Sequence, residues 1–394
     1  MKLRTLADIA ELEGKKVLVR VDFNVPINKK GEVQDDTRIR AAIPTIEHLR
    51  EKGAKIILIS HLGRPSAGEL EEHLRLNHVA HRLSEILAMP IKKMDTVLGE
   101  KVKNCIKEMK NGEIVILENI RSHSEERKCE DWFVEELSEL GEIFISDAFG
   151  TAHRHHASTC GLADKLPAYA GLLMEKEIAA LSPLLKECEK PLTMIFGGAK
   201  IDTKIGVIKN FLDKADHFLI GGGIANTFLY AQGHDVGTSL CEEDKKETAL
   251  EILEKGGAKV LLPSDVVVAT EISTTAEAQT VSAEEVSGEM KILDIGANSA
   301  EEFCEIIKKS KTIIWNGPVG LYEFPQFGNG TKIIAECIAT HECTSILGGG
   351  DTSDAVKRLG IPKEKFTHIS TGGGAAIEFL EGKTLPGIKC LLAN

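Results

Sequence analysis

Short runs of apolar and β-branched residues alternate along this chain with longer stretches in which apolar residues recur every three or four positions. The runs are almost continuously apolar, which is typical of strands buried on both faces of a parallel sheet. They predict strands at residues 17–21, 55–60, 113–117, 143–146, 193–196, 217–220, 260–262, 312–315, 344–347 and 366–370. Helical patterns between them, such as 38–52 and 76–88, predict a doubly wound α/β architecture.

The alternation breaks near residue 170, in the segment Leu166-Pro167-Ala168-Tyr169-Ala170-Gly171. A helical stretch at 172–188 follows, and a new strand begins after Pro191. We therefore predict two domains of ordinary size, which suits a chain of 394 residues. Residues 263–290 are less regular, and we interpret them as a strand excursion without assigned chemistry.

Composition narrows the class of protein. Hydrophobic residues make up 42% and charged residues 27% of the chain, which is typical of a globular protein. The nine cysteines include no CxxC pair, which disfavours a zinc site or a disulfide framework and favours a reducing compartment. We expect a cytoplasmic protein, because the first residues do not resemble a signal peptide and no segment approaches the roughly 20 apolar residues of a membrane span. A net charge of −12 disfavours general nucleic-acid binding.

Arginine and glycine are distributed unequally. Eleven of the twelve arginines lie at or before Arg154, whereas 25 of the 36 glycines lie in residues 191–394. One half is thus rich in cations and the other in bare backbone. Drift of composition between two domains would produce the same asymmetry. The positions of these residues relative to the predicted strands distinguish drift from a functional separation.

In the first half, polar residues follow the predicted strands. They form the segments Asp22-Phe23-Asn24, His61-Leu62-Gly63-Arg64-Pro65, Glu118-Asn119-Ile120-Arg121 and 147–154, which ends in Arg154. Ligands of open parallel sheets bind beyond the carboxyl ends of the strands. Together with Arg38, which opens the helix after the first strand, these arginines predict a pocket for phosphate and carboxylate groups. The alternative is that they pair with structural carboxylates such as Glu118 and Asp147.

In the second half, glycine-rich turns follow the predicted strands. They are 197–200, which ends in Lys200, and 221–223, 316–320, 348–352 and 372–374. Glycine lets backbone N–H groups approach an anion, and a following helix adds its positive end, so five such turns predict a polyphosphate ligand. Lys200 and Lys204 are four residues apart and are predicted to share one face of the entering helix; an exposed basic face is the alternative.

Three further observations leave alternatives open. Asp351 precedes a predicted helix and is either its N-cap or a ligand of nucleotide-bound Mg²⁺. His153, His155 and His156 suggest a metal site only weakly, and a polar loop is the preferred interpretation. The chain has no GxxxxGK[ST] motif and no HRD or DFG motif, and the turn at Gly221 resembles only a degenerate dinucleotide fingerprint, with Asn226 at the third small position.

Taken together, the motifs resemble those of the phosphoglycerate kinase family. The resemblance rests on Val19-Arg20-Val21-Asp22-Phe23-Asn24-Val25-Pro26, Ser60-His61-Leu62-Gly63-Arg64-Pro65, 147–154, Trp315-Asn316-Gly317-Pro318, 348–352 and 370–375. They occur in the family's order over nearly the whole chain, and the length resembles that of the bacterial form. Ile120, Ser122 and His155 depart from the pattern, which bears on the shape around Arg121.

The resemblance implies two Rossmann-like domains that face each other across a hinged cleft. It implies a phosphoglycerate-binding domain at 1–170 plus 378–394, the C-terminal tail returning to it, and a nucleotide-binding domain at 171–377 with a linker helix near 172–188. Carried onto matching positions, the phosphoglycerate ligands are Asp22, Asn24, Arg38, His61, Arg64, Arg121 and Arg154. The nucleotide ligands are Lys200, Lys204, Asn316, Glu323, Gly349, Gly350, Asp351 and Thr352, with Asp351 near Mg²⁺. Arg38, Lys200, Gly373 and Gly374 are implied to stabilise the transferring phosphoryl group, in a monomeric enzyme that uses ATP, ADP and Mg²⁺.

The implied reaction moves a phosphoryl group between 1,3-bisphosphoglycerate and ADP, giving 3-phosphoglycerate and ATP. Because either acceptor is already anionic at neutral pH, no general base is needed, and positioning and electrostatic stabilisation carry the catalysis. Two alternatives remain. An NAD-dependent oxidoreductase with two Rossmann-like halves would require a complete GxGxxG turn. A non-catalytic phosphate-binding module would require only one of the two pockets.

Overall fold

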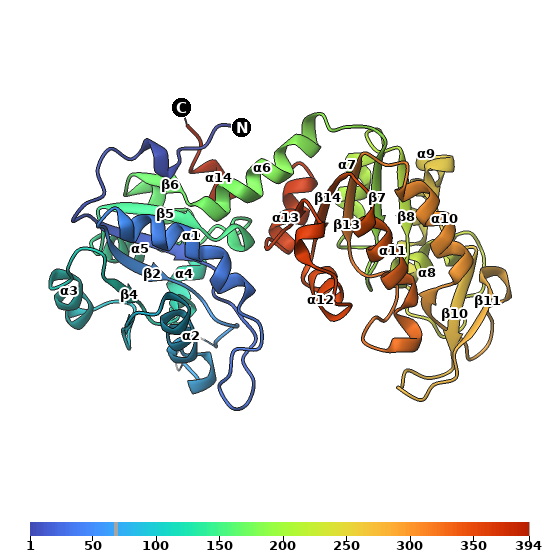
Figure 1. Cartoon of the computed structure of the whole chain (residues 1–394), viewed down its shortest axis with the longest axis horizontal. Coiled ribbons are helices and arrows are strands. Elements are labelled where there is room, and N and C mark those ends of the chain that lie inside the picture. The colour runs from blue at the N-terminus through green and yellow to red at the C-terminus, as the bar shows by residue number, and fades with distance from the viewer. Residues whose placement is uncertain (67–69, 394) are drawn as a thin grey trace. The chain divides into compact units, whose positions relative to one another are not determined.

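The structure is a computed structural model that describes residues 1–66 and 70–393 (Figure 1). Its contacts divide the chain into unit 1, which comprises residues 1–179 and 384–394, and unit 2, which comprises residues 180–383. Each unit is built on one parallel sheet with six strands. The predicted α/β class is confirmed.

The sheet of unit 1 has the strand order β3-β4-β2-β1-β5-β6, and all its pairs are parallel. Its strands are β1 (Lys16–Val21), β2 (Lys55–Ile59), β3 (Lys92–Lys93), β4 (Ile114–Ile116), β5 (Ile143–Asp147) and β6 (Ala168–Ala170). Its helices are α1 (Thr37–Glu51), α2 (Asn77–Leu87), α3 (Glu100–Lys107), α4 (Ser124–Lys128), α5 (Asp131–Ser138) and α14 (Pro386–Lys389). Helix α6 (Leu172–Lys186) begins in unit 1 and ends in unit 2.

The sheet of unit 2 has the order β15-β14-β13-β7-β8-β9 and is also parallel. Its strands are β7 (Leu192–Phe196), β8 (His217–Ile220), β9 (Val260–Leu261), β13 (Thr312–Asn316), β14 (Thr344–Gly348) and β15 (His368–Ile369). Its helices are α7 (Ile205–Phe211), α8 (Gly222–Ala231), α9 (Lys246–Gly256), α10 (Ala297–Ile307), α11 (Asn329–Thr340), α12 (Gly350–Arg358) and α13 (Gly374–Leu380).

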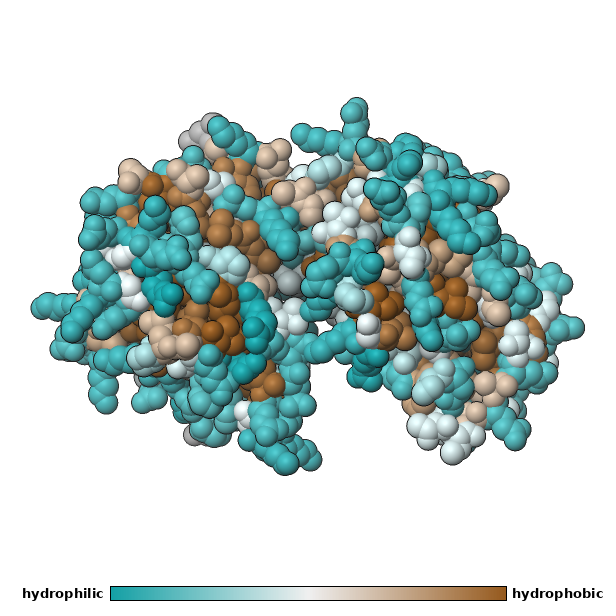
Figure 2. All heavy atoms as spheres, viewed as in Figure 1, coloured by the Kyte–Doolittle hydropathy of each residue, from teal (hydrophilic) through white to brown (hydrophobic). Residues whose placement is uncertain are grey.

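The apolar spacing of each helix explains how it covers its sheet. In α1, Ile39, Ala42, Ile46 and Leu49 recur every three or four residues, and they pack with the fully buried β1 residues in one core. Trp315 of β13 lies in the corresponding core of unit 2. Polar side chains cover most of the visible surface of each unit (Figure 2). No helix among the described residues has the length and apolar character that would let it cross a membrane.

One segment differs from the sequence predictions, and a second confirms the predicted strand excursion. The break near residue 170 contains a strand, β6, which pairs with the edge of β5; three residues are too few to show a pattern. The irregular region belongs to a second, antiparallel sheet in which β10 (Asp265–Ala269) lies between β11 (Gln279–Ser282) and β12 (Lys291–Ile295). Strands β11 and β12 are partly exposed and lack the continuous apolar runs of the parallel sheets, whereas the central β10 is mostly buried.

The C-terminal segment packs on unit 1 from Thr384 onward. Its backbone contacts join Arg4 N to Leu391 O at 2.8 Å and Gly387 N to Ala152 O at 2.8 Å. Residues 378–383 lie in unit 2 instead, because α13 is tied to α7 by a 2.6 Å hydrogen bond from Asn210 Nδ2 to Leu380 O. The contacts therefore change from one unit to the other at 179 and 383, whereas the sequence suggested 170 and 377.

Candidate active site

The first group of candidate residues lies at the carboxyl edge of the sheet in unit 1. Strand β1 pairs with β2 on one side and β5 on the other, with Arg20 opposite Ile59 and Val21 opposite Asp147. The residues that follow these strands therefore emerge at the same edge. The segment that begins with Asp22 follows β1, and His61 follows β2.

Asp22, Asn24 and Arg38 form a connected group at this edge. Arg38 Nη1 donates to Asp22 Oδ2 at 2.9 Å and lies 3.4 Å from the carbonyl oxygen of Asn24. The Asn24 side chain accepts a 2.8 Å hydrogen bond from the backbone of Gly63, which links this group to the loop after β2. The neighbouring Asp36 binds Arg40 and Arg82 instead. Arg38 thus pairs with another predicted substrate ligand.

Arg121 carries a positive charge close to other positive charges. Its Nη1 donates to Gly63 O at 3.0 Å, and its buried Nε has no hydrogen-bond partner among the described residues. Burial, and then the charge of Arg20, lowers the pKa of Arg121 to about 10. A buried guanidinium beside other positive charges is stabilised by a nearby anion. The charge of exposed Arg154 also acts on Arg121, which places it near this group, and Arg64 is exposed next to Gly63.

The carboxylates suggested as alternative partners are engaged elsewhere. Glu118 contacts Lys93 at 2.6 Å and Arg75 at 3.2 Å. Asp147 accepts backbone hydrogen bonds at the start of α6, from Leu173 at 2.9 Å and Met174 at 3.2 Å. Neither carboxylate neutralises the arginines of the group, which supports the interpretation of an anion pocket.

Arg20 belongs to this group and was not among the predicted site residues. It lies inside β1 and is 1% exposed, with Nη2 3.1 Å from His61 Nδ1. The available signal for Arg20 was a single charge within the apolar run 17–21, a position inside the strand and not at its carboxyl end. Burial, and then the charge of Arg20, lowers the pKa of His61 well below its ordinary value. His61 is therefore neutral and forms no ion pair with Asp22, whose Oδ1 lies 3.8 Å away.

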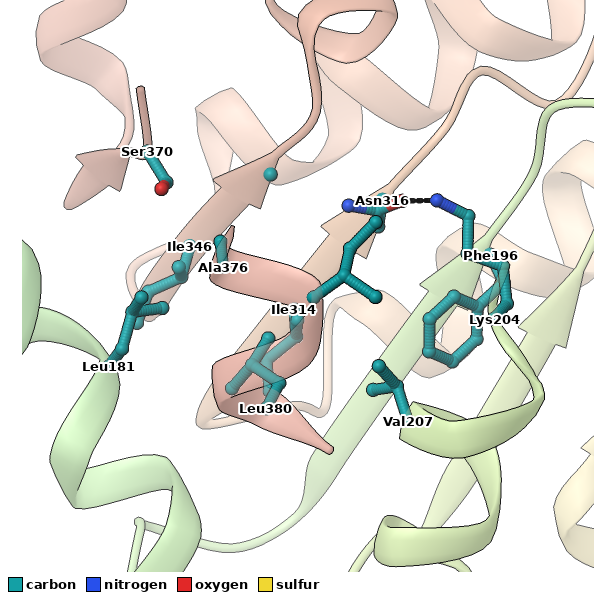
Figure 3. Close-up of a pocket in the computed structure, with 12 residues that line it drawn as sticks. Leu181, Phe196, Lys204, Val207, Ile314, Asn316, Ile346, Ser370, Ala376 and Leu380 are labelled. Atoms are coloured by element: carbon teal, nitrogen blue, oxygen red, sulfur yellow. Dashed lines mark hydrogen bonds between the residues drawn. The ribbon is translucent and has the colours of Figure 1, made fainter. Parts of the chain in front are cut away.

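The second group lies at the carboxyl edge of the sheet in unit 2. Asn316 is the last residue of β13, and its side chain accepts a short hydrogen bond from Lys204 Nζ. Figure 3 shows these two side chains pointing toward each other beside the apolar residues Phe196, Val207 and Ile314. Burial lowers the pKa of Lys204 to about 8, although the charge of Asp351 opposes this change.

The prediction that Lys200 and Lys204 share one face of a helix is wrong. Helix α7 begins only at Ile205, so both lysines lie in the preceding loop. The backbone of Ile201 donates to Glu242 Oε2 at 2.5 Å, and Lys204 N donates to Ile201 O at 2.7 Å, which closes a turn. This turn separates the exposed Lys200 from the half-buried Lys204.

The glycine-rich turns are of two kinds. At Gly197 an added Cβ would lie 2.0 Å from Pro318 O, so this glycine permits two loops to touch. Gly349 and Gly373 have positive φ, at 95° and 51°, and an added Cβ on Gly373 would have no neighbour within 4 Å. The open turns therefore suit an anion, whereas the turn at 221–223 packs against its neighbouring loops.

Asp351 is not the N-cap of α12, because Gly349 occupies that position. The carboxylate is exposed in the first helical turn, which leaves it accessible to a ligand. Behind it, Thr352 Oγ1 accepts from Gly317 N and donates to Gly348 O, both at 2.8 Å, and so joins the loops after β13 and β14.

A cavity of about 640 Å³ lies beside these loops. Its walls include apolar side chains such as Val266 and Leu293, with Glu323 and Asp351 at polar positions. This volume and lining are typical of pockets for small molecules such as a nucleoside. No cluster of three or more metal-ligating side chains occurs in residues 1–66 and 70–393.

Two α/β units, each on its own parallel sheet, one with clustered cations and the other with open glycine turns beside such a cavity, define a class of two-domain α/β proteins that bind anionic small molecules. The family model for phosphoglycerate kinase matches residues 6–383. A phosphoglycerate kinase of Dictyoglomus turgidum is 50% identical over 397 residues, covering 99% of each chain. The chain belongs to the phosphoglycerate kinase family.

Solved structures show the same relationship. The phosphoglycerate kinase of Coxiella burnetii is 38% identical, with a TM-score of 0.87 over 99% of this chain and 98% of its own. That of Pyrococcus horikoshii is 33% identical, with a TM-score of 0.88 over the same shares. The chain is thus a phosphotransferase whose acceptor is a carboxyl group. The comparisons give no support to the NAD-dependent oxidoreductase.

Proposed function

We propose that this enzyme transfers a phosphoryl group reversibly between 1,3-bisphosphoglycerate and ADP, in glycolysis or gluconeogenesis. The reaction is inferred from family membership. The cations around Arg38 and Arg121 are the observation that supports binding of the phosphorylated glycerate in unit 1. We also propose that it is a cytoplasmic monomer, which is what the family resemblance implies.

The proposed glycerate ligands lie in unit 1 and carry mostly positive charge. They are Asp22, Asn24, Arg38, His61, Arg64, Arg121 and Arg154. Guanidinium groups bind phosphate and carboxylate through paired N–H donors, which suits a substrate with anionic groups at both ends. Asp22 and Asn24 orient Arg38 through the contacts described above.

The proposed nucleotide ligands lie in unit 2, around the cavity and the open turns. They are Lys200, Lys204, Asn316, Glu323, Gly349, Gly350, Asp351 and Thr352. Glu323 lines the cavity, where it would meet the nucleoside, whereas Lys204 and Asn316 meet near the turn at 348–352. Arg38, Lys200, Gly373 and Gly374 would stabilise the charge of the transferring phosphoryl group.

A magnesium ion fits this arrangement as a companion of the nucleotide. Asp351 offers one exposed carboxylate, and proteins commonly hold Mg²⁺ through one or two carboxylates together with substrate phosphates. The bound ion would neutralise phosphate charge. Asp351 would orient it, while Lys204 contributes charge from the neighbouring loop.

Purified enzyme is expected to consume ATP only when 3-phosphoglycerate and Mg²⁺ are both present, because the carboxylate of the glycerate is the acceptor. A coupled assay that follows ADP formation measures this dependence, with glycerate and Mg²⁺ omitted in turn. Equal ATP turnover without the glycerate would mean a simple ATPase and would contradict the proposal.

Nucleotide affinity is expected to fall as the pH rises above about 8. Free Lys204 loses its proton as the pH passes its pKa of about 8, and only the cation attracts phosphate. Binding at higher pH must therefore take up a proton, and the affinity should fall by up to tenfold per pH unit. Calorimetric titration of ADP between pH 7 and 9.5, in buffers of different ionisation enthalpy, measures both effects.

Lys204→Arg provides the control, because arginine stays protonated over this range. Its affinity should be lower overall but should lose the pH slope. A slope that persists in Lys204→Arg would assign the titration to another group.

A further inference from the structure

A fully buried chain of polar contacts lies behind the glycerate group. Arg20 uses all three of its guanidinium nitrogens inside the protein: Nε donates to Ser158 Oγ at 2.8 Å, Nη1 donates to Val21 O, and Nη2 lies 3.1 Å from His61 Nδ1. At 1% exposure, this arginine is poorly placed to bind a substrate itself. Besides the effect of its charge, Arg20 can act on the site through the groups that it contacts.

Ser158 and Glu126 fix the position of that guanidinium. Ser158 Oγ donates to Glu126 Oε1 at 2.6 Å, and Ser158 N donates to Oε2 at 2.9 Å. Both residues are 0% exposed. Since the serine hydrogen is given to the carboxylate, the serine oxygen can only accept from Arg20. The hydrogen bonds thus run in one direction, from Arg20 in β1 to Ser158 and on to Glu126 in α4. Ser158 lies in the loop before the 3-10 helix Gly161–Asp164.

This chain determines which nitrogen of His61 carries hydrogen. A guanidinium only donates, so His61 Nδ1 must accept from Arg20, and the imidazole hydrogen must be on Nε2. The charged and titratable groups that act on this ring come from several elements. They are Arg20 of β1, Asp22 after β1, Arg38 of α1, Arg121 of the 3-10 helix Ile120–Ser122, and His156. Burial, and then the cations, which outnumber the single carboxylate, keep the ring neutral.

We propose that Glu126 and Ser158 are positioning residues that act through Arg20 and keep His61 as a neutral Nε2–H donor for the glycerate substrate. Nothing in the reaction itself requires a buried carboxylate and serine at this place. The part concerning the substrate rests on the proposed function of His61, whereas the link from Glu126 to the tautomer of His61 does not.

The variant Ser158→Ala removes the bridging hydroxyl and keeps both charges. The guanidinium can then move directly onto the Glu126 carboxylate, and His61 loses the donor at Nδ1. Ser310→Ala is the matched control, since Ser310 is equally buried in unit 2, with its hydroxyl 2.7 Å from Thr193 Oγ1. Imidazole ¹H–¹⁵N spectra, assigned with His61→Gln, report the tautomer and the pKa of His61.

In the unaltered enzyme His61 should be the Nε2–H tautomer, with a pKa well below its ordinary value. In Ser158→Ala its pKa should move up toward the ordinary value of about 6.5. The KM for 3-phosphoglycerate should rise about three- to tenfold, which corresponds to the net free energy of one hydrogen bond, and kcat should change little. Ser310→Ala should match the unaltered enzyme in all of these.

Unchanged His61 signals in Ser158→Ala, or an Nδ1–H tautomer in the unaltered enzyme, would overturn the proposal. The double variant Arg20→Met/Glu126→Gln removes both buried charges together, so neither is left unpaired. The pKa of His61 should rise, because the charge of Arg20 is gone, but burial should keep it below its ordinary value. If the spectra change as expected and the KM does not, the link to His61 holds and the proposed substrate role of His61 is wrong.

Discussion

Arg38→Ala is expected to lower kcat by about 10²–10³-fold, the usual effect of losing one preorganised donor to a transition state. kcat/KM should fall at least in parallel, because the proposed contact with the phosphoryl group forms only during transfer, and the loss of Arg38 as a glycerate ligand should add only a smaller rise in KM. The fold should tolerate the change: the Arg38 side chain is 35% exposed, and Asp22 keeps a hydrogen bond from the backbone of Asn24. Steady-state kinetics and a thermal melt of the same preparation test both statements.

Arg40→Ala is the matched control, since Arg40 lies on the same helix and pairs with Asp36. Its kcat should be unchanged. Arg38→Lys should recover only part of the lost rate, because an ammonium group has no fork. A stable Arg38→Ala protein with a changed KM and an intact kcat would make Arg38 a ground-state binder. A lowered melting temperature with an intact kcat would make it a structural partner of Asp22.

Gly197→Ala is expected to destabilise unit 2 by about 3 kcal/mol or more, because overpacking against rigid backbone leaves nothing that can yield. The new Cβ would lie 2.0 Å from Pro318 O and 2.5 Å from Pro318 C. Gly197 N also donates to Asn316 O at 3.1 Å, so the shift would reach Asn316 and weaken nucleotide binding as well.

Tryptophan fluorescence can report the unfolding of unit 2 separately from that of unit 1. The chain has two tryptophans, of which Trp315 is buried in β13 and Trp132 is 50% exposed in unit 1. In a Trp132→Phe background, denaturant unfolding therefore reports on unit 2. Gly350→Ala is the control, because a Cβ there has no neighbour within 4 Å, and its stability should change by less than about 0.5 kcal/mol. Equal losses of stability in Gly197→Ala and Gly350→Ala would show that the backbone around Gly197 relaxes easily to accept the new Cβ.

Much of the fold could be predicted from local patterns. Strands such as β8 (His217–Ile220) were predicted to the residue, and most others within one, because a strand buried on both faces leaves an apolar run in the sequence. The same logic located candidate residues, since the carboxyl ends of parallel strands share an edge. Contacts then joined Asp22, Asn24, Arg38, His61 and Arg121 into one group.

The sequence by itself determined the parallel α/β class, the ends of the strands and the separation of arginines from glycines, since each is written in neighbouring residues. Only the tertiary structure decided that Arg20 is enclosed by Ser158 and His61, far away in the chain. It also decided that Lys200 and Lys204 differ in exposure, and that the glycine at 197 serves packing while the one at 373 faces open space. The physical reason is that burial, pairing and close approach are set by residues distant in sequence, whose positions no local pattern records.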